Sequence, residues 1–287
     1  METNFTLAAP PRRIPLFVQS KIYFGGMINQ IGWAIFLFGI LTSWAFGVDQ
    51  IFKSWYQFSG TLDHTEGLVI EVGESAGSEG NVPVMQMDYV FDVDGREYKG
   101  RSYFTGEFYE KGSKVEVEYA FMNPEYSRIS GLRSSLFGAG IVFVLLFPLI
   151  GFIMVLTGIT IGRKTVNLLK NGKPVFGKLV KKSVSNISVN NVPLDSLTFE
   201  YSAEDSKAYS VSLNKAPTHH LQVDSQQRML YNPKAPRYAR LLDDLPGSVI
   251  LNSTGNFQRR ENANLFTDII VLILPVFTLY ILFLWLF

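Results

Sequence analysis

The stretch Leu136–Ile161 reads LFGAGIVFVLLFPLIGFIMVLTGITI and contains no charged residue. A membrane-spanning helix needs only about 20 consecutive apolar residues, because each residue adds about 1.5 Å of length. Two other blocks, Ile22–Val48 and Ile269–Phe287, also lack Asp, Glu, Lys, Arg and His. We therefore predict three transmembrane helices, at residues 22–48, 136–162 and 268–287.

The segments between these blocks change to the period-two alternation of β-strands. Val84–Val93 alternates in this way, Asp94–Gly95 is a strong hairpin signal, and Lys114–Ala120 alternates charged with apolar residues. Short strands with polar turns favour a small β-barrel or sandwich. We predict an N-terminal arm (1–21), a first β-module (59–133), a second β-module (172–252) and a linker (253–267).

The two β-modules share a sequence pattern. Asn81-Val82-Pro83 recurs as Asn191-Val192-Pro193, and Gly67 corresponds to Gly177, all at an offset of 110 residues. With small shifts, Asn123–Pro124 aligns with Asn232–Pro233. A fixed offset of this kind indicates an internal repeat. The predicted fold class is therefore a membrane α+β protein, with three transmembrane helices and two homologous small all-β modules inserted between them.

Glycines recur on the predicted membrane helices. Small residues at such spacings allow two membrane helices to approach closely. The helix-packing candidates are Gly25, Gly32, Gly39, Gly151, Gly158 and Gly162. Pro148 lies near the middle of the second predicted helix, where a proline usually produces a kink.

The net charge of +1 hides an asymmetry between the two modules. Residues 53–135 carry a net charge of −6, and residues 163–266 carry a net charge of +7. Basic residues beside membrane helices are retained in the cytoplasm. Arg12, Arg13 and Lys21 precede the first helix, so we expect a cytoplasmic N-terminus. The candidates for contact with lipid headgroups are Arg163, Lys164, Arg259 and Arg260.

The motifs of the first module resemble those of the bacterial membrane proteins grouped as domain-of-unknown-function family 3592. The resemblance rests on Gly67–Ile70, Asp94–Tyr98, Gly112–Tyr119 and Asn123–Arg128, and a more divergent copy follows in the second module. It implies a location in the bacterial inner membrane and this modular architecture. The family has no established activity, so the resemblance implies no catalytic residue.

No pattern of catalytic chemistry stands out in the sequence. The absence of cysteine excludes thiol nucleophiles and cysteine-based metal sites. His219 and His220 are adjacent, so on a strand they point to opposite faces and rarely share a metal. The carboxylates of the first module alternate along strands, as on a solvent-facing surface. We therefore predict no catalytic, cofactor-binding or metal-ligating residue, and no cofactor.

The expected function is a non-enzymatic, membrane-anchored interaction or accessory module, with the lipid bilayer and a protein or second copy as partners and without nucleic acid. The alternative is a small channel or transport subunit built by oligomerisation through the glycine faces. A membrane-associated hydrolase is the third interpretation.

Overall fold

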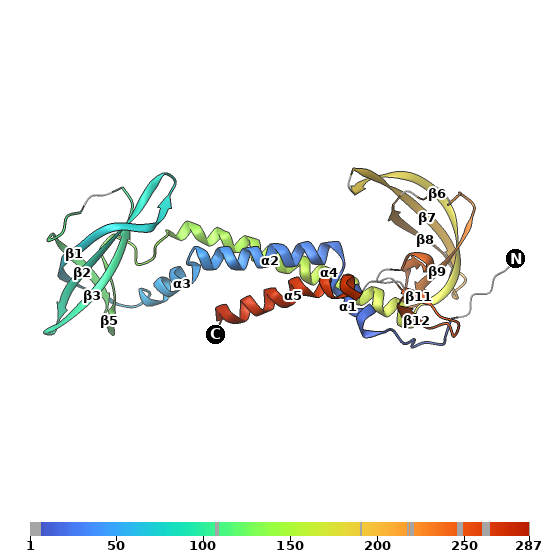
Figure 1. Cartoon of the computed structure of the whole chain (residues 1–287), viewed down its shortest axis with the longest axis horizontal. Helices are drawn as coiled ribbons and strands as arrows, with labels where there is room; N and C mark the ends of the chain where they lie inside the picture. The colour runs from blue at the N-terminus through green and yellow to red at the C-terminus, as the bar shows by residue number, and fades with distance from the viewer. Residues whose placement is uncertain are drawn as a thin grey trace. The chain divides into compact units, whose positions relative to one another are not determined.

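A computed structural model describes residues 7–106, 109–189, 191–216, 218, 221–245, 249–259 and 265–286 (Figure 1). The chain divides into two compact units. One comprises Met1–Ala34 and Phe152–Tyr280, and the other comprises Ile35–Gly151 and Ile281–Phe287. Each unit contains one five-stranded β-sheet together with helical segments, so the fold is mixed α+β.

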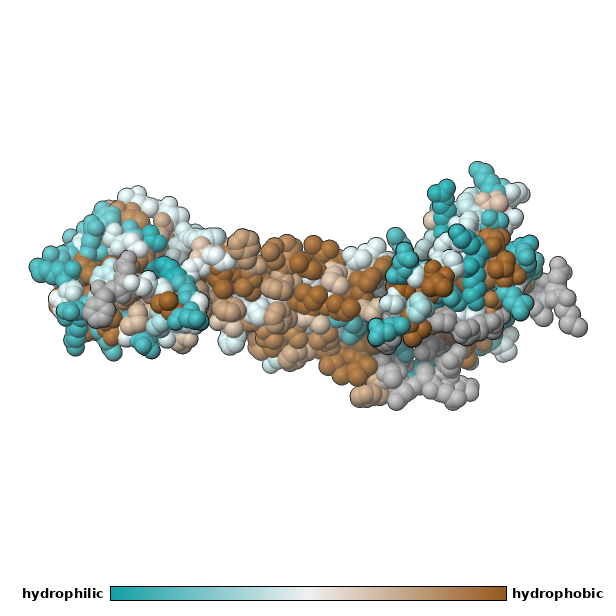
Figure 2. All heavy atoms as spheres, turned by 90° about the horizontal axis from the view of Figure 1, so that it is seen from above, coloured by the Kyte–Doolittle hydropathy of each residue, from teal (hydrophilic) through white to brown (hydrophobic). Residues whose placement is uncertain are grey.

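Two helical segments are long and apolar enough to cross a membrane. They are α2 (Met27–Ala45) and the continuous run of η1 (Ala139–Leu145) and α4 (Leu146–Asn171). The apolar part of α5 (Leu265–Leu286), Ile269–Trp285, is shorter. Many large apolar side chains of these helices are exposed, and Figure 2 shows them as brown residues gathered over the helical part of the molecule.

The first predicted helix, 22–48, is interrupted at both ends. α1 (Leu16–Phe24) begins inside the segment that we predicted as an N-terminal arm (1–21), and Gly25 and Gly26 separate it from α2. Gly47 has a φ of 60° and separates α2 from α3 (Val48–Gln57). Glycine adopts this left-handed conformation without the steric cost of a Cβ atom, which explains the break.

The second predicted helix also differs from expectation. α4 continues to Asn171, beyond the predicted end at 162, because Val166, Leu168 and Leu169 are buried in a cluster with residues of α1. Pro148 lies in the first turn of α4 and not at its middle. The missing N–H of a proline is tolerated in a first turn, and the kink itself stays a prediction.

The first sheet is a nearly closed barrel. It contains β1 (Leu62–Glu79), β2 (Val82–Val93), β3 (Arg96–Phe104), β4 (Lys114–Ala120) and β5 (Asn123–Ile129), in the order β3-β2-β1-β4-β5. The edge strands β3 and β5 meet where the Ile129 N–H donates to the Ser102 hydroxyl at 2.9 Å. The predicted Asp94–Gly95 turn joins β2 to β3, and both residues have positive φ.

The second sheet has the same strand order. It contains β6 (Lys173–Val189), β7 (Val192–Ser202), β8 (Ala208–Lys215), β9 (Gln226–Asn232) and β10 (Ala235–Leu241). The irregularities in β1 after Val69 and Glu74 recur in β6 after Leu179 and Val184. The register at both Asn-Val-Pro segments also agrees at the offset of 110 residues. A common origin of the two modules stays a prediction that this likeness supports.

One expected equivalence between the modules is wrong. Asn123 follows the β4–β5 turn and pairs with Ala120, whereas Asn232 precedes the β9–β10 turn and pairs with Ala235. Asn123–Pro124 and Asn232–Pro233 therefore occupy different places in the two hairpins. The sequence alignment paired two Asn-Pro dipeptides, but Asn123 begins the strand after its turn, whereas Asn232 ends the strand before its turn.

Each sheet has a core built from its own side chains, and the core positions correspond. Val69, Met87, Tyr89, Phe91 and Val117 are at most 3% exposed in the first sheet. Leu179, Leu197, Phe199, Tyr201 and Met229 fill the corresponding positions of the second. The predicted linker 253–267 contains β12 (Phe257–Arg259), which pairs with β11 (Val249–Leu251), so part of it belongs to the folded unit.

Candidate functional site

Among the predicted packing glycines, Gly39, Gly158 and Gly162 touch another helix. A Cβ atom on Gly39 would collide with Pro148, one on Gly158 would lie 2.6 Å from Asn29 Cβ, and one on Gly162 would lie 3.0 Å from the backbone of Tyr23. Gly32 and Gly151 are buried, whereas Gly25 is exposed. The glycine faces thus bring α4 against α1 and α2 within the same chain.

Two amides beside these glycines contact backbone carbonyls of neighbouring helices. Asn29 is fully buried, and its Nδ2 donates to the carbonyl of Val155 at 3.2 Å. Gln30 Nε2 donates to the carbonyl of Val271 in α5 at 2.9 Å. Val271 lies four residues before Pro275, which has no N–H to donate to it. Gln30 therefore compensates the hydrogen bond that Pro275 removes from α5.

Arg12 has a structural role that the sequence did not reveal. It is only 4% exposed, and its Nη1 donates to the carbonyls of Leu169 at 3.1 Å and Gly172 at 2.8 Å. Its Nε donates to the carbonyl of Ala8 at 2.8 Å. A cation at a helix C-terminus satisfies carbonyls that have no helical partner and complements the helix dipole. Arg12 is therefore a buried cap of α4 and not an exposed charge of the N-terminal arm.

The predicted headgroup contacts occupy different surroundings. Arg163 and Lys164 are exposed and directly follow the apolar part of α4. Arg259 lies at the end of β12 and is half-buried. Arg260 lies outside the described residues, as do His219 and His220. The position of Arg163 and Lys164 at the end of the apolar part of α4 is compatible with the predicted contact with headgroups.

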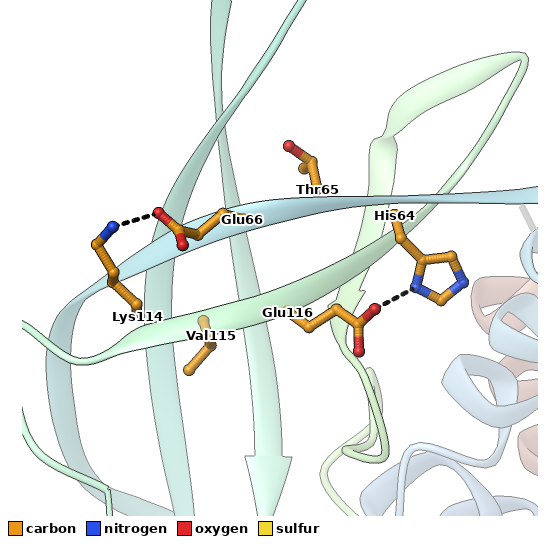
Figure 3. A pocket seen from close by; sticks show the side chains of 6 residues that line it. All are labelled: His64, Thr65, Glu66, Lys114, Val115 and Glu116. Atoms are coloured by element: carbon orange, nitrogen blue, oxygen red, sulfur yellow. Dashed lines mark hydrogen bonds and ion pairs between the residues drawn. The ribbon is translucent and has the colours of Figure 1, made fainter.

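The first barrel carries a shallow charged groove on its outer face, which we call the β1–β4 groove (Figure 3). It encloses about 440 Å³. Its lining residues are His64, Thr65, Glu66, Lys114, Val115 and Glu116. These side chains come from two adjacent antiparallel strands, because Glu66 pairs with Glu116 and Leu68 with Lys114 in the ladder. Strand alternation points the charged ones outward.

The side chains in the β1–β4 groove form one ion pair, Lys114–Glu66, and one close contact, His64–Glu116 (Figure 3). Lys114 Nζ lies 2.7 Å from Glu66 Oε1, and His64 Nδ1 lies 3.3 Å from Glu116 Oε1. All four side chains are at least about half exposed, so the pairs contribute little to stability. Among the described residues, no group of three His, Asp or Glu side chains converges as metal ligands would. The groove presents both charge signs to solvent.

Two further carboxylates of the first module, Asp88 and Glu118, also form cross-strand pairs. Asp88 accepts two hydrogen bonds from Arg101, at 2.6 and 2.9 Å, and Glu118 pairs with Arg128. Bidentate pairing of arginine with a carboxylate fixes both side chains. These carboxylates therefore strengthen the ladder and do not converge on a common point.

Glu79 joins the tip of the β1–β2 hairpin to the chain that enters η1. Its carboxylate pairs with Arg133, and it also accepts hydrogen bonds from Thr105 Oγ1 at 3.0 Å and the Gly138 N–H at 3.2 Å. The hydrogen bond from Arg133 is the main cause that lowers the pKa of Glu79 below its ordinary value, although partial burial opposes it. The sequence offered no signal for this cluster, because its members are far apart in the chain.

No protein-family model and no curated protein matches this chain.

Proposed function

We propose that the chain is an integral protein of the bacterial inner membrane, with three transmembrane helices and two β-modules that bind other proteins. The apolar helices support the membrane location. Phe143, Ile153, Val276 and Phe283 are 54 to 75% exposed, and such a surface is unfavourable in water and favourable in lipid. The resemblance to domain-of-unknown-function family 3592 agrees with this location.

The direction of insertion is proposed from charge. Basic residues flanking membrane helices favour the cytoplasm, and Arg163 and Lys164 directly follow the apolar part of α4. We place the N-terminus and the second module, which has a net charge of +7, in the cytoplasm. The first module, with its net charge of −6, then lies on the outer side.

One observation carries the proposed role of the modules: their interiors are filled by their own side chains. In the first module, Met87 and Tyr89 are fully buried, and Phe91 stacks on Tyr98 and Tyr119. A partner therefore binds on the outside, where the β1–β4 groove displays Glu66, Lys114, His64 and Glu116. Exposed charges of both signs suit a polar segment of another protein, since charge complementarity selects partners.

The test is capture of partners by the full-length chain in its native membrane, followed by cross-linking and mass spectrometry. The double variant Glu66→Lys, Glu116→Lys replaces both negative charges of the β1–β4 groove by positive ones. A separate control variant, Glu125→Lys, makes the same kind of change at an exposed site on β5. We expect partners of the wild type to be depleted with the double variant and retained with Glu125→Lys. Capture that is equal for all three proteins contradicts this role of the groove.

The positions of the glycines bear on the alternative of an oligomeric channel. Gly39, Gly158 and Gly162 contact helices of the same chain, so their surfaces are occupied within the monomer. A channel would need to assemble through other surfaces. This observation favours the role as an interaction module over assembly through the glycine faces.

A further inference from the structure

A narrow apolar groove lies between α2 and the end of α5, and we call it the α2–α5 groove. It encloses about 240 Å³. Its walls are Ile40, Leu41, Trp44, Ile281, Leu284 and Trp285. All six side chains belong to one compact unit. An apolar groove on apolar helices is suited to a hydrocarbon chain.

The α2–α5 groove opens at one end into a polar mouth. Trp44, Leu284 and Trp285 line both spaces, so the two adjoin. The mouth encloses about 720 Å³ and is otherwise lined by Gly47, Asp49, Gln50 and Lys53. The left-handed turn at Gly47 redirects the chain from α2 into α3, which brings these polar residues over the end of the groove. Tryptophan is enriched at this kind of apolar–polar boundary in membranes.

The mouth contains one positive and one negative charge side by side. Lys53 Nζ lies 2.9 Å from Asp49 Oδ2, and the two side chains are 69% and 37% exposed. A lysine ammonium has three N–H donors, and this pair uses one of them. The remaining donors can bind a phosphate, and the remaining carboxylate lone pairs can accept from an ammonium.

We propose that the α2–α5 groove and its mouth bind one zwitterionic phospholipid. An acyl chain occupies the apolar groove between Trp44 and Trp285. The phosphate lies at Lys53, and the headgroup ammonium lies at Asp49. This site rests on the membrane location proposed above, and it is independent of what the β-modules bind.

The size of the groove favours a lipid over a helix of a second protein. One turn of an α-helix, about 10 Å wide and 5.4 Å long, fills about 400 Å³. The α2–α5 groove, at about 240 Å³, is smaller than one such turn. Part of an acyl chain is thinner and flexible, and each buried methylene contributes about 0.8 kcal/mol.

The test uses the purified full-length chain in detergent, with bound lipid counted by native mass spectrometry. The probes are phosphatidylethanolamine, phosphatidylglycerol and glycerophosphoethanolamine, the last of which has the headgroup without acyl chains. We expect one phosphatidylethanolamine to bind per chain and phosphatidylglycerol, which lacks the ammonium, to bind about fivefold more weakly. Binding of the tail-free headgroup should be undetectable.

Matched variants assign the binding to this site. Leu41→Trp fills the groove and should abolish binding, whereas Leu149→Trp, at an exposed position of α4, should leave it unchanged. Leu284→Trp, on the opposite wall, repeats the test if Leu41→Trp does not fold. Asp49→Asn should reduce the affinity for phosphatidylethanolamine to that for phosphatidylglycerol, while Glu125→Gln should not.

Three results overturn the proposal: equal binding of both phospholipids by the wild type, binding that Leu41→Trp and Leu284→Trp leave intact, and dimers that these substitutions dissociate. The last result assigns the groove to a second copy of the chain. Failure of the membrane location is recognised separately, because alkaline carbonate would then release the chain from membranes. The two failures are therefore distinguishable.

Discussion

At the scale of single residues, Gly100 is the position where one added methyl group is least tolerated in the first barrel. It pairs with Tyr89 on the neighbouring strand, and a Cβ atom there would overlap the Tyr89 ring and approach Ser127 Oγ at 2.6 Å. Tyr89 donates a hydrogen bond to Ser127 at 3.0 Å and is fully buried, so the ring has no room to move. Burial also raises the pKa of Tyr89, which keeps its hydroxyl protonated.

We predict that Gly100→Ala lowers the free energy of unfolding by about 1 to 3 kcal/mol, the usual cost of overpacking a core. Gly73→Ala is the matched control, because a Cβ atom on Gly73 of β1 meets nothing within 4 Å. Unfolding of the full-length protein in detergent, followed by circular dichroism, measures both. Equal stability of the two variants would show that the Tyr89–Ser127 contact does not constrain the barrel.

The Glu79 cluster should make stability depend on pH. The folded protein lowers the pKa of Glu79, so the ionised carboxylate is favoured in the folded state. The resulting stabilisation is present above the ordinary carboxyl pKa and is lost as the pH falls through the lowered value. We expect the wild type to lose more stability than Glu79→Gln between about pH 6 and pH 3. Glu74→Gln, on the same hairpin at an exposed position, should behave like the wild type in a pH series of thermal unfolding.

At the scale of elements, docking of α5 depends on the hydrogen bond from Gln30 to Val271. We predict that Gln30→Leu destabilises the protein by about 1 kcal/mol, within the range measured for interhelical hydrogen bonds in membranes. Pro275→Ala restores the N–H that bonds Val271 within α5, so Gln30→Leu should cost less in that background. A double-mutant cycle of thermal stabilities in detergent measures the coupling. If the effects of the two substitutions on stability are strictly additive, Gln30 does not replace the hydrogen bond that Pro275 removes.

The elements were predictable where one local pattern determined them. The alternation in Lys114–Ala120 gave the bounds of β4, and Asp94–Gly95 gave the β2–β3 hairpin. The end of α4 was not predictable, since Arg163 and Lys164 end the apolar stretch while buried Leu168 and Leu169 continue the helix. The extension is buried by its contacts with α1. The hydropathy of one segment gives no information about its contacts with another segment, so the extension could not be predicted.

The candidate sites were likewise predictable only where a local sequence pattern determined them. Spacing alone suggested Gly39, Gly158 and Gly162 as packing positions, and the structure places each of them against another helix. The role of Arg12 was missed because its partners, Leu169 and Gly172, lie about 160 residues away. The α2–α5 groove was missed for the same reason, since its walls come from opposite ends of the chain.

At the scale of the whole molecule, the number of membrane crossings determines where the two β-modules lie. Three crossings would place them on opposite sides of the membrane, and the basic residues that flank the helices favour the cytoplasm for the N-terminus and the second module. The main rival has one apolar block that enters and leaves on the same side, which would place both modules together. The two arrangements differ in which exposed residues an impermeant reagent reaches.

Single cysteines distinguish these arrangements cleanly, because the chain contains no native cysteine. Ser78 in β1 and Ser206 in the β7–β8 turn are both exposed, so either cysteine is accessible to a reagent on its own side. In intact cells, an impermeant thiol reagent should label Ser78→Cys and spare Ser206→Cys, since the first module is proposed to be extracytoplasmic. After the cells are permeabilised, both should be labelled, which controls for the reactivity of Ser206→Cys. Labelling of both variants in intact cells would contradict the three-span topology, and labelling of Ser206→Cys alone would reverse its direction.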